Sequence, residues 1–289
     1  MIVGIEMWKE QFCKLFCSSD LLTFENIENA MELKYNNLPT LYKYTPFNDY
    51  SLNILEKDQL WISSPMSFND PYDCEYTMNF GKPNNIDFLI KKCKEKLPES
   101  EHQNFDKFID EILKKEYKKI VLDYNKFSKE RVFVSCFSEI NNSILMWSHY
   151  ANDHKGICIE FNFNELGIED IRTRLLFPVI YNNVLFDATR YLKSMKNKGK
   201  FNNFMPLCSA INKSKKWSEE KEWRFVSIVH SEPGLIQWLK PKAVYLGTNF
   251  RDKYMEKIMK IAKNRNFDVY QMNKTPNYGL ESKNIYKSH

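Results

Sequence analysis

Residues 132–163 read VFVSCFSEINNSILMWSHYANDHKGICIEFNF. In 132–137, Val132, Val134 and Cys136 alternate with Phe133, Ser135 and Phe137. In 157–163, the large apolar residues at odd positions alternate with the residues between them. Such alternation is typical of β-strands whose two faces meet different surroundings. Between these segments, residues 143–151 predict a short helix. The stretch therefore predicts a strand, a loop, a short helix and a second strand, and this unit is the centre around which the rest of the fold is interpreted.

Sequence on either side predicts more strands and helices, but not in regular alternation. Short apolar segments indicate strands at 40–45, 60–63, 178–181, 223–229, 243–247 and 267–272. Apolar residues at three-to-four spacing indicate helices at 5–16, 49–55 and 254–261. Because the order lacks regular βαβ units and internal repeats, we expect an α+β fold with a mixed, largely antiparallel central sheet flanked by helices.

The chain is expected to form a single domain over residues 1–289. Residues 1–38 predict a helical N-terminal extension, and residues 86–127 predict a helical insertion of two helices that could act as a lid. Residues 251–289 predict a C-terminal helix, strand and tail. The segment after Pro276 is polar and is expected to fray.

Composition narrows the class of protein more than it narrows the function. Hydrophobic residues make up 43% of the chain, enough to form a core, and no segment predicts a signal peptide or a membrane span. Seven cysteines, an odd number without a CxxC pair, favour free thiols over disulfides or zinc. We therefore expect a cytoplasmic protein without a membrane or metal partner. The sequence does not indicate its oligomeric state.

The formal net charge of +5 supports only a weak preference for anions. Basic residues are densest between Lys193 and Lys216, where Lys196, Lys198 and Lys200 occur. This region is interpreted either as a surface for nucleic acid or phosphate or, with more support, as a solvated helix face.

Residues 216–224, KWSEEKEWR, place two carboxylates at the start of an apolar strand. Glu220 and Glu222 are two residues apart, so on a strand both would project to one side, and Arg224 would share that side. Arg224 could then fix one carboxylate while the other meets a ligand hydroxyl or a developing positive charge. The alternative is a purely structural network of ion pairs.

The short central helix supplies a second group of candidate residues. Trp147 and Tyr150 are close enough to form an aromatic wall for a planar ring, although core packing explains them equally well. His149 could act as a general base, but a structural role is favoured for a histidine beside aromatic residues. His154 is expected in a turn.

A third group, Tyr42-Lys43-Tyr44, lies on the strand at 40–45, where a hydroxyl or an ammonium could bind a phosphate or a ribose hydroxyl. The alternative is an ordinary amphipathic strand. The chain contains no GxGxxG, Walker, HExxH, GxSxG or protein-kinase motif, which disfavours the best-marked nucleotide-binding, metalloprotease and hydrolase classes.

Six motifs in this order resemble domain of unknown function family 2971, a bacterial family, over roughly residues 40–250. They are Leu41-Tyr-Lys-Tyr44, Ser67-Phe-Asn-Asp-Pro71, Ser135-Cys-Phe-Ser138, Met146-Trp-Ser-His-Tyr-Ala151, His154-Lys-Gly-Ile157, and Trp217 with Glu220, Glu222 and Arg224. This resemblance implies a family core over that range and suggests a role in bacterial anti-phage defence or stress response.

The order of elements is also similar to ADP-ribosyltransferases that modify nucleic acid or protein, in which a late catalytic glutamate helps to enclose NAD. That resemblance implies that Glu222, after Glu220, is the catalytic carboxylate and that Ser138 matches a hydroxyl on the second strand. Lys43 or Tyr44 would stand where those enzymes have His or Arg.

The same resemblance implies that Trp147 and Tyr150 wall the nicotinamide side of the site. It predicts transfer of ADP-ribose from NAD, as the substrate, to a nucleic-acid or protein acceptor. Two alternatives stay open: a non-enzymatic module that senses a nucleotide or a partner, and a nuclease or RNA-processing enzyme that does not use NAD.

Overall fold

The computed structural model describes residues 3–18, 23–80, 86–191 and 204–288. Lys193, Lys196, Lys198 and Lys200 of the basic region lie outside these ranges. The helices are α1 (Val3–Phe16), α2 (Phe24–Asn36), α3 (Asp49–Lys57), α4 (Ile86–Lys94), α5 (His102–Lys129), α6 (Ile144–Tyr150), α7 (Ile171–Arg174), α9 (Phe204–Ala210) and α10 (Met255–Arg265). Within the described residues, every helix is too short or too polar to span a bilayer.

Eight strands form the central sheet, in the order β14-β13-β12-β5-β1-β4-β10-β6. They are β1 (Leu41–Thr45), β4 (Phe133–Ser138), β5 (Ile157–Phe161), β6 (Leu176–Pro178), β10 (Glu222–Ser227), β12 (Ala243–Leu246), β13 (Asp268–Lys274) and β14 (Leu280–Tyr286). Within this sheet, the β12–β13 pair is parallel and the other described pairs are antiparallel. The prediction of an α+β fold with a mixed, largely antiparallel sheet is confirmed.

Three small two-stranded sheets accompany the central one. They pair β2 (Gln59–Ile62) with β11 (Gly234–Gln237), β3 (Tyr76–Thr77) with β8 (Phe186–Asp187), and β7 (Ile180–Asn182) with β9 (Asn212–Ser214). The strand predicted at 60–63 therefore exists, but it belongs to a side sheet. The strand predicted at 178–181 is divided into β6 and β7 at Val179.

Residues on opposite faces of the sheet belong to different core clusters. Leu41, Ile159, Phe137 and Phe225 lie on one face in a cluster with residues of α3 and α10. On the other face, α1, α2 and α9 cover the β4–β10–β6 end, and α6 covers the β1–β5–β12 end. The boundary between those two clusters is where the polar residues of the candidate site gather.

One terminal prediction is wrong. The segment after Pro276 was expected to fray, but residues 280–286 form β14 and pair with β13 from Val269 to Lys274. Most side chains of β14 are exposed. The strand is stabilised by its backbone hydrogen bonds rather than by burial, as is common for a polar edge strand.

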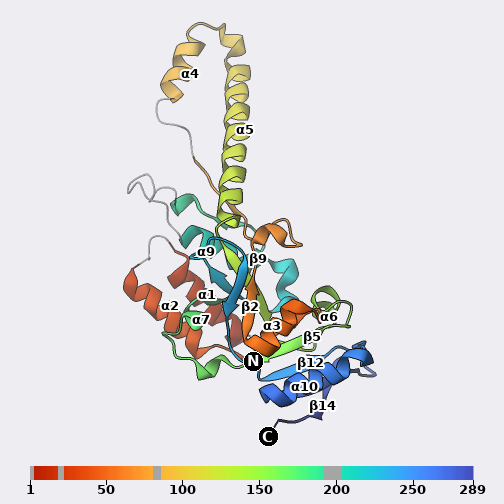
Figure 1. Cartoon of the computed structure of the whole chain (residues 1–289). Helices are drawn as coiled ribbons and strands as arrows, with labels where there is room; N and C mark the ends of the chain where they lie inside the picture. The colour runs from red at the N-terminus through yellow and green to blue at the C-terminus, as the bar shows by residue number, and fades with distance from the viewer. Residues whose placement is uncertain (1–2, 19–22, 81–85, 192–203, 289) are drawn as a thin grey trace.

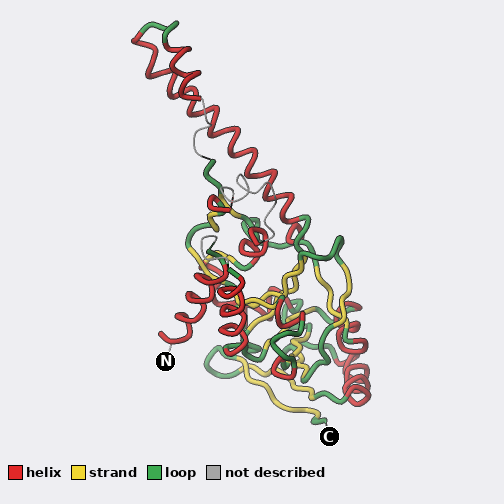
Figure 2. The backbone as a smooth tube through the Cα atoms, turned by 90° about the vertical axis from the view of Figure 1, so that its left-hand side faces the viewer, coloured by secondary structure: helices red, strands yellow, loops and turns green. Residues whose placement is uncertain are grey.

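Residues 86–127 form the two predicted helices, α4 and α5, and α5 continues to Lys129. Figures 1 and 2 show α5 projecting from the body as an arm, with α4 beside its outer half. α4 has no buried residue. The idea that this insertion lies over the site as a lid receives no support, because both views show the arm pointing away from the body.

Candidate functional site

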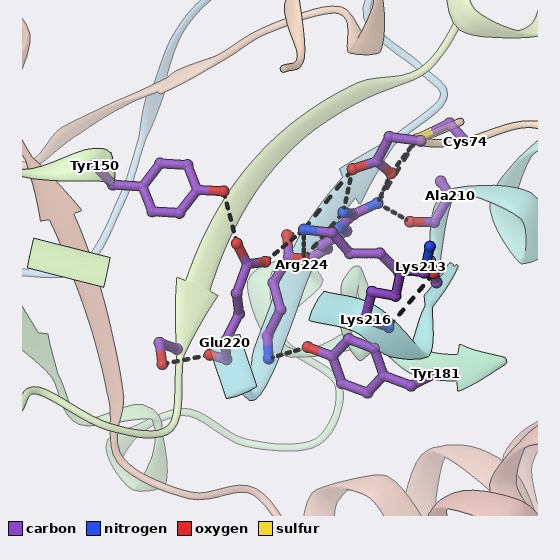
Figure 3. Close-up of polar contacts among 12 residues, drawn as sticks. Cys74, Tyr150, Tyr181, Ala210, Lys213, Lys216, Glu220 and Arg224 are labelled. Carbon is purple, nitrogen blue, oxygen red and sulfur yellow. Dashed lines mark hydrogen bonds and ion pairs between the residues drawn. The ribbon is translucent and has the colours of Figure 1, made fainter. Parts of the chain in front are cut away.

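Arg224 is the centre of a buried network of ion pairs (Figure 3). Its Nη1 and Nη2 bond both carboxylate oxygens of Asp73, at 2.6 and 2.8 Å. Its Nε and Nη2 bond the two oxygens of Glu222, at 2.7 and 3.0 Å, and Nη1 also donates to the carbonyl of Ala210. All five N–H groups of the guanidinium thus have acceptors, as a fully buried arginine requires.

Lys213 joins this network to Glu220. Its Nζ lies 2.5 Å from Oε2 of Glu220, 2.9 Å from Oε2 of Glu222 and 3.9 Å from Asp73. The other oxygen of Glu220 accepts a hydrogen bond of 2.7 Å from the hydroxyl of Tyr150. Every carboxylate oxygen of Glu220 and Glu222 therefore has a donor.

The network keeps Glu222 ionised. Burial by itself would raise the pKa of Glu222, but the charges of Arg224 and Lys213 outweigh burial and lower that pKa to about 2. The pKa of Lys213 is raised because attraction to the carboxylates, that of Glu222 foremost, outweighs its burial. The pKa of Tyr150 is also raised, by burial and then by Glu220. At neutral pH the network therefore carries fixed charges, and Tyr150 remains a hydrogen-bond donor.

A cavity of about 490 Å³ opens beside this network. β1 pairs with β5 at five positions but with β4 only at Tyr42↔Ser138, so the strands separate beyond that point. Residues from both strands line the cavity, together with Met146, His149 and Tyr150 of α6. Its volume lies in the usual range for small-molecule sites, roughly 300–1,000 Å³.

The two ends of the cavity differ in chemistry. Asp73, Lys213, Glu220, Glu222 and Arg224 form a charged end, where the guanidinium of Arg224 lies 5.7 Å from the centre of the Phe68 ring. Tyr50 and Trp61 contribute further aromatic surface to the lining. The rings of Tyr50 and Trp61 lie 5.1 Å apart. Such a combination of flat apolar surface and fixed polar groups suits a ligand that carries a ring and several hydroxyls or anionic groups.

The side chain of Lys43 extends from β1 toward β4 and forms part of the cavity lining. Its Nζ donates to Oγ of Ser135 at 2.8 Å and to the carbonyl of Cys136 at 3.2 Å. Both acceptors are neutral, so within the described part of the chain the ammonium has no carboxylate bonded to it. Burial lowers the pKa of Lys43, although nearby Cys136 and Glu222 act in the opposite direction. An anionic ligand group would provide the missing counter-charge.

Most of the predicted site residues come together at this cavity. Those that line it are Tyr42, Lys43, Tyr44, His149, Tyr150, Glu220, Glu222 and Arg224. Arg224 and Glu222 share one side of β10, as predicted. The expectation that one carboxylate would remain free is wrong, because Lys213 and Tyr150 bind Glu220.

Glu220 does not lie on the strand as predicted. It ends a 3₁₀ helix, Lys215–Glu220, and Lys221 after it has a φ of 45°, in the left-handed region. The two glutamates nevertheless converge, because Lys213 binds both.

Trp147 and Ser138 are placed differently from the prediction. Trp147 is fully buried, stacks edge-on against Tyr44 and donates from Nε1 to the carbonyl of Asn141. Met146, His149 and Tyr150 form the cavity-facing side of α6. Each residue turns a helix by about 100°, which rotates Trp147 from Met146 toward the sheet. Of the two residues in the predicted aromatic wall, Tyr150 therefore lines the cavity and Trp147 lies in the core.

Ser138 is buried, and its hydroxyl forms hydrogen bonds with backbone groups. Its Oγ donates to the carbonyl of Glu220 at 2.7 Å and accepts from the N–H of Ile140. These bonds hold the end of the 3₁₀ helix against β4. Its hydroxyl is therefore a positioning group for Glu220, and its predicted catalytic role has no geometric support.

Two residues of the network were missed by the sequence interpretation. Asp73 is 151 residues from Arg224. Lys213 belongs to the basic region 193–216, for which a solvated helix face was favoured, but it is buried on β9 and paired with Glu220. Asp73 follows closely after the motif at 67–71, which is the only local signal that could have marked it. Within the described ranges, no group of three or more His, Cys, Asp or Glu residues is arranged to hold a metal ion.

Residues 146–225 match the model of a family described as Protein of unknown function (DUF2971), which confirms the predicted family resemblance over that segment. No curated protein and no solved structure matches the chain. The matched segment begins on α6 and ends on β10, so it includes Tyr150, Lys213, Glu220 and Glu222.

Proposed function

We propose that this chain, whose residues 146–225 carry the DUF2971 match, binds a nucleotide-type ligand in the cavity and transfers ADP-ribose from NAD to a macromolecular acceptor. The observation that carries the proposal is the presence, in the lining of one cavity, of the carboxylate of Glu220 and of an ammonium, Lys43, that has no bonded carboxylate among the described residues. Location in the cytoplasm and a role in defence or stress stay predictions.

The lining residues fit the chemical parts of NAD. Lys43 would hold the diphosphate, because its ammonium is the cation in the lining without a bonded acid among the described residues. Tyr50, Trp61 and Phe68 offer flat surfaces to a base or to nicotinamide. Glu220 and Tyr150 would meet ribose hydroxyls at the charged end.

Glu220 is the better placed of the two glutamates for chemistry. Departure of nicotinamide leaves positive charge on the ribose, and a carboxylate beside the ribose stabilises that charge in the transition state. Glu220 shares its oxygens with Tyr150 and Lys213, whereas both oxygens of Glu222 are bonded to Arg224 and one of them also to Lys213. We therefore assign ligand contact to Glu220 and positioning of Lys213 to Glu222.

The test is transfer from labelled NAD to a mixture of nucleic acid and protein extracted from the source cells. Glu220→Gln removes the charge while keeping the size of the side chain, and it should reduce transfer by about 100-fold or more. Glu219→Gln, at the exposed neighbouring position, is the matched control and should transfer normally. Equal transfer by the wild type and Glu220→Gln, or none by the wild type, would end the proposal.

A second function, binding without turnover, is favoured by one specific observation. The acids at the charged end are saturated by Arg224, Lys213 and Tyr150, as expected for a rigid recognition site. In that case a nucleotide-type ligand should bind with comparable affinity to the wild type and Glu220→Gln, while Lys43→Met should bind at least about tenfold more weakly. Calorimetric titration with NAD, ADP-ribose and ATP distinguishes the two functions.

A further inference from the structure

Three free thiols from two elements meet in the core cluster that α1 and α9 form, outside the cavity. Cys13 lies in the last turn of α1 and Cys17 directly follows that helix, where its N–H donates to the carbonyl of Cys13 at 2.8 Å. Cys208 lies on α9. The thiol of Cys17 is hydrogen-bonded to the thiols of both Cys13 and Cys208. The three sulfur atoms therefore form a row with Cys17 in the middle.

The hydroxyl of Tyr191 holds the two elements together at this row. It donates to the carbonyl of Cys17 at 3.0 Å and lies 3.6 Å from Sγ of Cys208. Cys17, Tyr191 and Cys208 are buried, whereas Cys13 is partly exposed. A small oxidant in the solvent therefore reaches the row first at Cys13.

The hydrogen bonds give the thiols different reactivities. The pKa of Cys13 is lowered, because the hydrogen bond from Cys17 outweighs the effect of burial. The pKa of Cys17 is raised, first by its hydrogen bonds to Cys13 and Cys208 and then by burial. The thiolate is the form of cysteine that reacts with peroxides. An accessible thiol with a lowered pKa beside a second thiol is the arrangement typical of redox-sensing cysteines.

We propose that Cys13, Cys17 and Cys208 form a peroxide-sensitive modification site whose oxidised form holds a disulfide between Cys17 and Cys208. The thiolate of Cys13 attacks hydrogen peroxide and becomes a sulfenic acid, and hydroxide leaves and takes up the proton that the Cys13 thiol had released. The thiol of Cys17 then attacks the sulfur of Cys13, and the hydroxyl leaves with the proton of Cys17 as water. In total, two thiols and one hydrogen peroxide give one disulfide and two waters.

The disulfide then passes to Cys208. In a helix the Cβ atoms of residues four apart are about 5–6 Å from each other, whereas a disulfide needs roughly 3.5–4.5 Å. A Cys13–Cys17 bridge therefore strains the last turn of α1. The thiol of Cys208 attacks the sulfur of Cys17, and Cys13 leaves and takes up the proton of Cys208. Because Cys17 and Cys208 belong to different elements, their bridge does not strain a helical turn.

The bridge acts on the segment that leads to the charged end of the cavity. The carbonyl of Cys208 accepts a hydrogen bond of 2.7 Å from Nδ2 of Asn212, and the carbonyl of Ala210 accepts one of 2.7 Å from Arg224. Lys213 is the next residue on β9. A bridge from Cys208 to the end of α1 therefore constrains the segment that presents Lys213 to the two glutamates.

Peptide mapping tests the proposal, because trypsin separates the three thiols into residues 10–14, 15–34 and 201–213. The full chain is treated with a small excess of hydrogen peroxide, alkylated, and digested without reductant. Mass spectrometry of the wild type should find peptides 15–34 and 201–213 joined by a disulfide, which dithiothreitol separates again. A treated wild type in which these two peptides stay unlinked would overturn the proposal, whether or not the chain acts on NAD.

Three variants test the order of the steps. Cys93→Ser, which removes an exposed thiol on α4, is the matched control and should form the bridge like the wild type. Cys13→Ser should form it at least about tenfold more slowly, because peroxide must then react with a buried thiol. Cys208→Ser should instead accumulate peptides 10–14 and 15–34 joined to each other. Circular dichroism checks that each variant is folded, and equal rates for the wild type and Cys13→Ser would refute the assignment of Cys13 as the reactive thiol.

Discussion

The carboxylate of Glu222 makes the stability of the protein depend on acid. Its pKa is lowered from an ordinary value of 4.5 to about 2, because Arg224 and Lys213 outweigh the effect of burial. A lowered pKa in the folded state means that the ionised form favours folding. The stabilisation is complete above pH 4.5 and is lost as the pH falls toward 2.

We therefore expect the free energy of unfolding to fall by about 3 kcal/mol between pH 5 and pH 2 through this residue. Denaturant unfolding at a series of pH values measures it. Glu222→Gln, which cannot ionise, should flatten this decline, and Glu219→Gln should leave it unchanged because Glu219 is exposed. A wild type and a Glu222→Gln variant with the same slope would show that the network is not ionised as described.

At the scale of the element, a tight contact joins the end of β12 to the turn after α6. Asn152, Asp153 and His154 all have a positive φ, between 50° and 63°, and the N–H of Asn249 donates to the carbonyl of His154. A Cβ atom at Gly247 would lie 2.0 Å from that carbonyl oxygen. The backbones can therefore approach only if position 247 is glycine.

Gly247→Ala should destabilise the fold by about 1–3 kcal/mol, because the backbone of the turn must move to make room. Gly167→Ala is the control, since a Cβ there meets no atom within 4 Å. Thermal unfolding of the two variants beside the wild type measures the difference. Equal melting temperatures for all three would mean that the turn moves away at little cost.

At the scale of the whole molecule, the body and the arm are stabilised to different extents. β4 and β10 are almost wholly buried and are paired at six positions, whereas α4 has no buried residue. The free energy of local unfolding is lowest where few apolar contacts must be broken.

Amide hydrogen exchange should therefore be fastest in α4 and the first half of α5, and slowest in β4 and β10. The measurement is made by mass spectrometry. Similar protection in α4 and β10 would contradict this picture and would indicate that α4 packs against a further surface.

The sequence by itself determined the features that depend on neighbours a few residues apart. Alternation along 132–137 and 157–163 predicted two strands, and the structure has them as β4 and β5. The spacing of Glu222 and Arg224 predicted a pair on one side of β10. The helices of the arm followed from apolar periodicity. These features are local because strand and helix periods repeat within one or two turns of the backbone.

Tertiary structure alone decided which distant residues complete the site. Asp73 and Lys213 reach Arg224 and Glu222 from other parts of the chain, and the rotation of α6 sends Tyr150 to the cavity and Trp147 to the core. A buried charge needs partners of opposite charge, and which ones arrive depends on the packing of distant elements rather than on spacing. The two glutamates, Arg224 and Tyr150 were therefore found from sequence, whereas Asp73 and Lys213, which complete the network, were not.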